Sequence, residues 1–161
     1  VDAKELVDIP DERIPLEFQE FCRHADVEDG AAGGTASVRC DLRDAPGYGA
    51  DTVWYDAFDA STRGRMAVVM TETANEAGAP TVEGGRAAVI RACTGVSGGA
   101  IGRWELGSSL SGQLACSTRD GEAWLAWTYE GPAIMAHAAR LDGDAVRLVG
   151  WWDERAADYL R

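Results

Sequence analysis

The sequence has almost no lysine: Lys4 is the only one among 15 basic residues, and the net charge at pH 7 is −12. A chain this acidic is repelled by nucleic acids and by anionic lipids, so we expect neither as a partner. No apolar run approaches the roughly 18 residues of a membrane-spanning helix, so this segment is not expected to insert into a membrane. The acidity indicates solubility or, alternatively, a surface for a cationic partner.

Metal-binding patterns are also scarce. The only histidines are His24 and His137, and no two of the four cysteines form a C-x-x-C pair, so a zinc site is not expected. Asp142 and Asp144 resemble the start of a calcium loop, but the glycine and the terminal glutamate at EF-hand spacing are missing. Capping of a helix by Asp144 accounts better for this motif. The sequence therefore predicts no metal and no cofactor.

The length of 161 residues fits one domain. Residues 1–13 are polar and are expected to fray. Segments 14–80 and 87–160 are roughly alike, because each contains a cysteine-bearing strand, a hairpin partner and then a helix. A duplication is therefore one interpretation of the chain.

An even number of cysteines favours disulfides, and disulfides favour an oxidising, extracytoplasmic compartment. Four reduced cysteines in a cytosolic core are the alternative. Of the three possible pairings we favour Cys22–Cys40 and Cys93–Cys116, because they close loops of similar length, one at the start of each half.

Apolar residues at helical spacing predict helices at 15–25, at 61–77 and after Asp144. Asp120-Gly121 and Gly131-Pro132 indicate tight turns between strands. The expected strands are 37–42, 52–58, 113–118, 123–129 and 134–140, with shorter and less regular ones at 87–92 and 103–106. This order predicts an α+β fold, in which an antiparallel sheet of about five to six strands carries its helices on one face.

One catalytic pattern is present. Gly95-Val96-Ser97-Gly98-Gly99 matches the G-x-S-x-G elbow of serine hydrolases, and Asp120 and His137 follow in the chain order of a triad. The elbow requires a strand before the serine and a helix after it, whereas glycine-rich chain follows here. A flexible glycine loop is the favoured interpretation, and His137 in an apolar strand is expected to be a partly buried histidine rather than a base.

Six tryptophans are many for this length, and exposed tryptophans bind sugars and peptides well. Most should belong to the core. Trp104, in the glycine-rich region, and Trp151, beside the apolar stripe of the last helix, are the candidates for an exposed pair that contacts a ligand.

Several segments match a known pattern of cysteines, sheet residues and helix tryptophans. They are Ile14-Pro15 before Cys22, Val38-Arg39-Cys40, Val53-Trp54-Tyr55, Gly112-Gln113-Leu114-Ala115-Cys116, Ala123-Trp124-Leu125-Ala126-Trp127-Thr128, Ala138-Ala139-Arg140-Leu141-Asp142-Gly143-Asp144 and Trp151-Trp152. Residues 14–153 thereby resemble the extracytoplasmic C-terminal domain of some actinobacterial serine/threonine protein kinases and related secreted or membrane-anchored proteins. The kinase motifs G-x-G-x-x-G, H-R-D and D-F-G are absent.

The resemblance implies a non-catalytic extracytoplasmic sensor or ligand-binding domain, coupled to a kinase or standing alone. A small molecule, a cell-wall fragment or a protein is the expected partner, and ligand-dependent dimerisation is the expected way of signalling. The alternatives are a secreted or lipid-anchored structural protein and a small hydrolase that uses Ser97.

Overall fold

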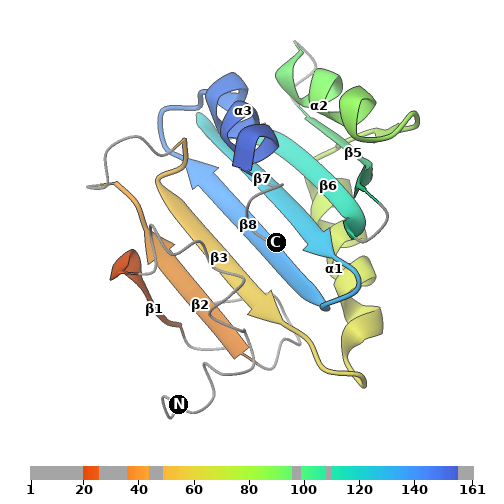
Figure 1. The fold of residues 1–161 in the computed structure, drawn as a ribbon. Helices are drawn as coiled ribbons and strands as arrows, with labels where there is room; N and C mark the ends of the chain where they lie inside the picture. The colour runs from red at the N-terminus through yellow and green to blue at the C-terminus, as the bar shows by residue number, and fades with distance from the viewer. Residues whose placement is uncertain (1–19, 26–35, 44–48, 96–98, 108–109, 156–161) are drawn as a thin grey trace.

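The computed structural model describes residues 20–25, 36–43, 49–95, 99–107 and 110–155. Their strands form one eight-stranded sheet in the order β1-β2-β3-β8-β7-β6-β5-β4 (Figure 1). Every neighbouring pair is antiparallel except β4–β5. The strands are β1 (Cys22–His24), β2 (Ala36–Asp41), β3 (Thr52–Ala57), β4 (Thr81–Val82), β5 (Gly99–Leu106), β6 (Leu110–Arg119), β7 (Glu122–Tyr129) and β8 (Ile134–Arg140). The α+β class is confirmed, with more strands than the five to six expected.

In the middle of the sheet, strand β3 from the first part of the chain pairs with strand β8 from the last part. Strands β5 to β8 follow one another as an antiparallel meander, and β8 then pairs with β3. The segment 14–80 supplies β1 to β3 and one helix, whereas 87–160 supplies four strands and two helices.

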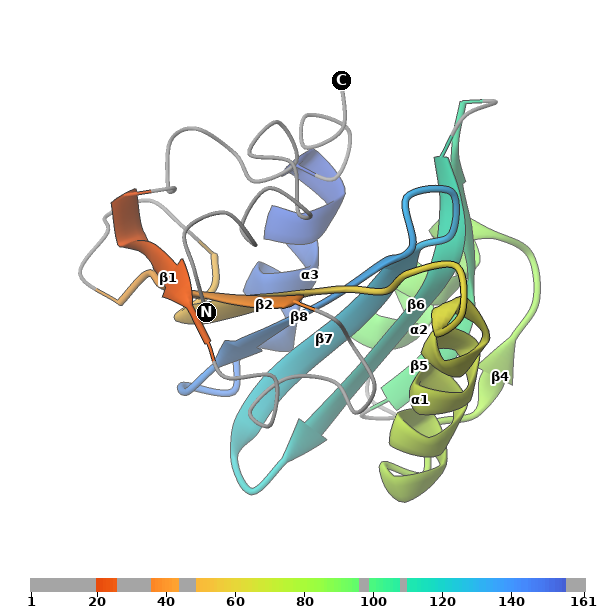
Figure 2. The same cartoon turned by 90° about the horizontal axis from the view of Figure 1, so that it is seen from below.

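The described segments also form three helices, which cover both faces of the sheet: α1 (Arg63–Glu76), α2 (Arg86–Thr94) and α3 (Ala145–Arg155). Figure 2 shows α3 and α1 on opposite sides of the strands. The residues buried under α2 and α3 and those buried under α1 form two separate hydrophobic clusters. The expectation that all helices pack on one face was wrong, because the apolar stripe of each helix is visible in the sequence whereas the sheet face that it covers is not.

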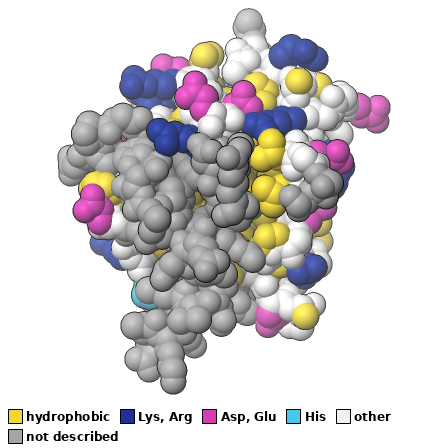
Figure 3. All heavy atoms as spheres, in the orientation of Figure 1, with side chains coloured by type: hydrophobic (Ala, Val, Ile, Leu, Met, Phe, Trp, Pro, Cys, Tyr) yellow, Lys and Arg dark blue, Asp and Glu magenta, His cyan; other side chains and the backbone are white. Residues whose placement is uncertain are grey.

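The α2–α3 side holds an aromatic core. Trp104, Trp127 and Trp152 are fully buried there and meet edge to face, with ring centroids 5.4 Å apart for Trp104–Trp152 and 6.4 Å apart for Trp127–Trp152. Charged side chains of both signs gather over the outer surfaces of α2 and α3 (Figure 3). Among them Arg86 and Asp153 form an ion pair of 2.7 Å that ties α2 to α3.

The strands predicted at 37–42, 52–58, 113–118, 123–129 and 134–140 are confirmed to within a few residues as β2, β3, β6, β7 and β8. The helix at 61–77 is confirmed as α1. In the last helix, Asp144 accepts a hydrogen bond from the backbone N–H of Arg147 at 3.0 Å, as predicted for its cap. Asp120 and Gly121 both have positive φ, as the tight turn requires.

Two assignments were wrong. The part of the predicted helix 15–25 that lies within the described residues contains β1, which pairs with β2. The predicted strand 87–92 is part of α2, whose buried residues Val89 and Cys93 lie one helical turn apart. Short apolar segments such as these fit both the helical and the strand period. Their packing partners in the folded chain therefore decide between helix and strand.

Gly99, the last residue of the expected glycine loop, and Gly102 both lie within β5. A Cβ at Gly102 would come within 2.9 Å of the Val82 carbonyl oxygen and 3.1 Å of the Val89 side chain. Glycine at this position therefore lets β4 and α2 approach the strand closely.

Both predicted disulfides are present, Cys22–Cys40 and Cys93–Cys116. The first joins directly paired residues of β1 and β2, and the second joins α2 to β6. Two disulfides indicate an oxidising, extracytoplasmic setting. Within the described residues no helix is long and apolar enough to cross a membrane.

Candidate functional site

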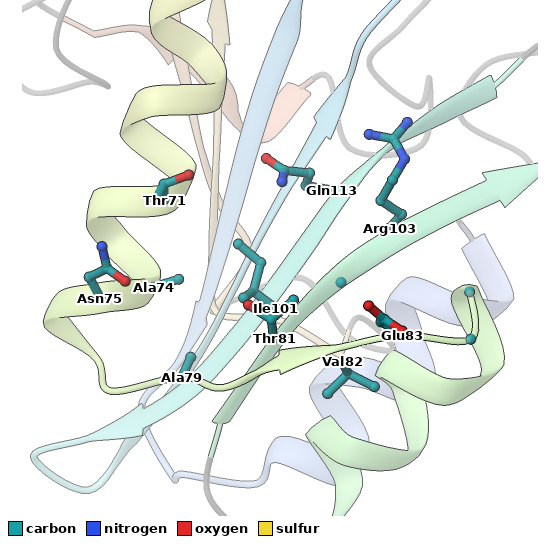
Figure 4. A pocket seen from close by; sticks show the side chains of 13 residues that line it. Thr71, Ala74, Asn75, Ala79, Thr81, Val82, Glu83, Ile101, Arg103 and Gln113 are labelled. Atoms are coloured by element: carbon teal, nitrogen blue, oxygen red, sulfur yellow. The ribbon is translucent and has the colours of Figure 1, made fainter.

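A hollow of about 380 Å³ lies between α1, the edge strand β4 and the neighbouring strands β5 and β6 (Figure 4). Its floor is apolar and includes Ala74 and Ile101, which belong to the cluster under α1. Polar side chains from five different segments surround it: Thr71 and Asn75 of α1, Thr81 of β4, Glu83 of the following loop, Arg103 of β5 and Gln113 of β6. Hollows of this size with an apolar floor and a few convergent polar groups are typical ligand sites.

A second hollow of about 280 Å³ continues along the same helix. It is bordered by Arg63, Met66, Thr128 and Glu130, and it shares Gln113 with the first. We call the two together the α1 groove. Gln113 therefore stands at the junction of the groove, and Figure 4 shows its side chain directed toward α1.

A local break in the β6–β7 ladder accompanies Gln113. The backbone N–H of Gln113 donates to the hydroxyl Oγ1 of Thr128 at 2.9 Å. Next to it Gly112 lies so close to the Thr128 carbonyl that a Cβ atom would collide with it. Further along, the N–H of Glu130 donates to the carbonyl oxygen of Ser111 at 3.0 Å. Only glycine fits at position 112, because any side chain would collide with Thr128. This close approach sets the position of the strand at Gln113, whose side chain lines the groove.

One ion pair spans the strands at the groove. Arg103 donates to both carboxylate oxygens of Glu130, at 2.7 and 3.0 Å. These hydrogen bonds lower the pKa of Glu130 and raise the pKa of Arg103. Because the two charges neutralise each other, they hold the groove in shape without giving it a net charge.

The side-chain amides of Asn75 and Gln113 differ from the hydroxyl of Thr71 in their hydrogen bonding. Among the residues that the structure describes, no hydrogen-bond partner is found for the side-chain amide of Asn75 or of Gln113. Thr71, in contrast, donates to the Ala67 carbonyl oxygen within its own helix at 3.0 Å. Each free amide offers a donor and an acceptor to a ligand. Neither Asn75 nor Gln113 was singled out as a site residue from the sequence, since their approach depends on how α1 lies on the sheet.

The structure describes two residues of the possible hydrolase triad, Asp120 and His137, and places them in different parts of the sheet. Ser97 lies outside the described residues. Around it the order is helix α2, then strand β5, the reverse of the strand and helix that the elbow requires. His137 pairs with Ala126 in the middle of β7, whereas Asp120 lies in the turn at the end of β6. The backbone on both sides of Ser97 thus differs from a hydrolase elbow.

The side chain of His137 stacks on the side chain of Trp54. Its imidazole lies parallel to the indole of Trp54, with ring centroids 4.6 Å apart and an interplanar angle of 16°. Burial lowers the pKa of His137 to about 4, so the ring is neutral at pH 7. This agrees with the predicted partly buried histidine.

The two tryptophans expected at the surface are buried. Trp104 is fully enclosed and packs edge to face against Tyr129 and Trp152. Trp151 is 6% exposed and packs against Trp127 and Gly49. The expectation of an exposed pair was wrong. Trp151 is covered because α3 lies flat on the sheet, and Trp104 is covered because it lies on β5 beneath Trp152 of the same helix.

The acidic pair after β8 has a structural role. Asp142 receives hydrogen bonds from the Arg140 side chain at 2.6 and 2.8 Å, and the ion pair lowers the pKa of Asp142. Asp144 caps α3. Across the described residues, no group of three or more histidine, cysteine, aspartate or glutamate side chains is placed to hold a metal ion.

Comparison with known proteins adds no relative. The chain matches no protein-family model, and searches of curated proteins and of solved structures give no match either. The geometry of the chain itself is therefore the basis for its function.

Proposed function

We propose that this chain is a non-catalytic, extracytoplasmic ligand-binding domain that takes a small polar molecule in the α1 groove. The observation that carries the proposal is the free pair of amides, Asn75 and Gln113, beside a hollow of about 380 Å³ with an apolar floor. A molecule rich in hydroxyl or amide groups suits this lining, because Arg103 and Glu130, the two charges beside Gln113, already satisfy each other.

The packing of α1 supports a groove that stays open. The helix is anchored by three buried residues, Met66, Met70 and Ala74, which lie on small residues of β6 and β7 such as Ala115 and Ala126. The remaining positions of α1 are exposed or half-buried. A helix held by one narrow stripe leaves room along its side, and a small shift of the helix could follow ligand binding.

The two disulfides support the extracytoplasmic part of the proposal. Attachment to a membrane-bound serine/threonine kinase rests on the resemblance of residues 14–153 alone. In that setting, ligand in the α1 groove would bias a monomer–dimer equilibrium and pass the signal to the membrane.

Ligand-observed NMR with a library of sugars, amino acids and small amides tests the proposal. A binder should lose at least about tenfold in affinity when Gln113→Met removes the amide but keeps the length of the side chain. Thr118→Val on the exposed end of the same strand should leave the affinity unchanged. The proposal is contradicted if no member of the library binds, or if a binder keeps its affinity for the Gln113→Met variant. Sedimentation with and without the binder tests the dimerisation separately.

A further inference from the structure

One row of paired residues crosses all eight strands on the face that carries α1. Following the register from β1 to β4, the row is Arg23, Arg39, Trp54, His137, Ala126, Ala115, Ile101 and Thr81. Directly paired residues point to the same face of a sheet. The second half of the row contains Ala126, Ala115 and Ile101 of the cluster under α1. The first half is of a different kind, because it is made of two arginines and two aromatic rings.

The arginines of this row face each other. Arg23 and Arg39 are a direct cross-strand pair, and like charges in that position destabilise a sheet. The disulfide between Cys22 and Cys40, the neighbouring pair, holds the two strands in this register. Neither guanidinium forms an ion pair or a hydrogen bond with any residue that the structure describes. Two cations are therefore held together, in a chain of net charge −12, and no carboxylate of the described part of the chain is bonded to them.

Among the acidic side chains that the structure describes on this face, Asp41 is already engaged. Asp41 accepts hydrogen bonds from the Arg43 side chain at 2.6 and 3.0 Å, which lowers the pKa of Asp41 to about 2. Arg39 contributes only a minor electrostatic part of that shift. Asp56 lies in the adjacent row, opposite Ser37, and is buried. Neither carboxylate is hydrogen-bonded to the arginine pair.

Arg39 is held in a fixed orientation. Its guanidinium lies over the indole of Trp54, 5.1 Å from the ring centroid, and the half-buried His137 stacks on the same indole. His137 is neutral at pH 7, so it adds no further positive charge. The Arg39 Nε–H is buried and has no acceptor among the described residues. A guanidinium stacked on an indole is pre-organised to bind a planar oxyanion.

We propose that Arg23 and Arg39, braced by Trp54, form a second binding site on this domain, for the carboxylate group of a small molecule. A carboxylate matches the planar fork of a guanidinium and supplies the missing negative charge. A single carboxylate also meets less long-range repulsion from the acidic chain than a doubly charged phosphate or a polyanion does. The site lies at the opposite end of the row from the α1 groove, and it does not depend on the function proposed for that groove.

NMR titration of the whole 161-residue chain with benzoate and acetate tests the site, with inorganic phosphate and chloride as comparison anions. The signals to follow are the indole N–H of Trp54, assigned with Trp54→Phe, and the Nε–H of Arg39. We expect both to shift and saturate with either carboxylate at millimolar concentrations. Chloride should give no saturable change, and phosphate should bind more weakly than the carboxylates.

Three variants and a control separate the site from general screening of charge. Arg39→Gln should weaken benzoate binding at least about tenfold, and Arg39→Lys, which keeps the charge but not the fork, should weaken it several-fold. Arg23→Gln, at an exposed position, should weaken it without affecting the fold. Arg65→Gln removes the same charge from the exposed side of α1 and should leave the affinity unchanged.

Four results would overturn the proposal. They are the absence of saturable shifts with both carboxylates, equal shifts with chloride, tighter binding of phosphate than of benzoate, and benzoate binding that survives both Arg39→Gln and Arg23→Gln. Near-UV circular dichroism of each variant shows whether its aromatic core is intact, so a loss of binding with an unchanged spectrum supports the site.

Discussion

His137 should make the stability of this domain depend on pH in a defined window. The folded chain keeps the imidazole neutral, because burial against Trp54 lowers its pKa from 6.5 to about 4. In the unfolded chain the ring takes up a proton near its ordinary pKa of about 6.5. Unfolding therefore binds a proton between these two values. The free energy of unfolding falls as the pH falls through this window and is independent of His137 above it.

The size of the effect follows from the two pKa values. Between pH 7 and pH 4.5 the linkage relation gives about 2.4 kcal/mol for values of 6.5 and 4. His137 keeps some contact with solvent, so we expect a loss of about 2 kcal/mol. The carboxylates with lowered pKa values, such as Asp41 and Glu130, lose their contribution only at lower pH, so the window reports mainly on histidine.

Urea unfolding at several pH values between 4.5 and 7, followed by tryptophan fluorescence, measures this dependence. His137→Gln should remove the slope whatever its effect on stability at pH 7, and His24→Gln serves as the matched control that keeps it. Equal slopes in the wild type and His137→Gln, or a pKa near 6.5 for His137 in an NMR titration of the folded chain, would refute the reasoning.

Two further predictions concern the packing around β6. Gly112→Ala places a methyl group against the Thr128 carbonyl, so thermal unfolding should show a loss of at least about 3 kcal/mol, whereas Gly131→Ala, in an open turn, should change stability by less than about 1 kcal/mol. A wild-type-like melting temperature for Gly112→Ala would contradict the packing of this strand pair. Replacing Cys93 and Cys116 together by alanine should cost about 3 kcal/mol, because the disulfide closes a loop with a sequence separation of 23; no change in urea midpoint would show that the bond does not form.

The elements read most clearly from the sequence were those with a long, regular pattern. The strands at 123–129 and 134–140, the Asp120-Gly121 turn and the cap of α3 by Asp144 depend on neighbours within a few residues, and the structure confirms them. The pairing of the cysteines was also predictable, since each pair lies within one half of the chain.

The candidate site was not predictable in the same way. Asn75 and Gln113 belong to elements 38 positions apart, and they share a groove only because α1 crosses to the face opposite α2 and α3. The burial of Trp104 and Trp151 likewise follows from how α2 and α3 lie on the sheet. No local signal in the sequence selects a sheet face for a helix.

The sequence by itself therefore determined the α+β class, the disulfides and most of the strands, because propensity, turn chemistry and side-chain period act between near neighbours. Only the tertiary structure decided the strand order, the two-sided arrangement of helices, the α1 groove and the row from Arg23 to His137. These features arise where segments far apart in the chain pair or pack, and the energy of such contacts depends on three-dimensional register rather than on local pattern.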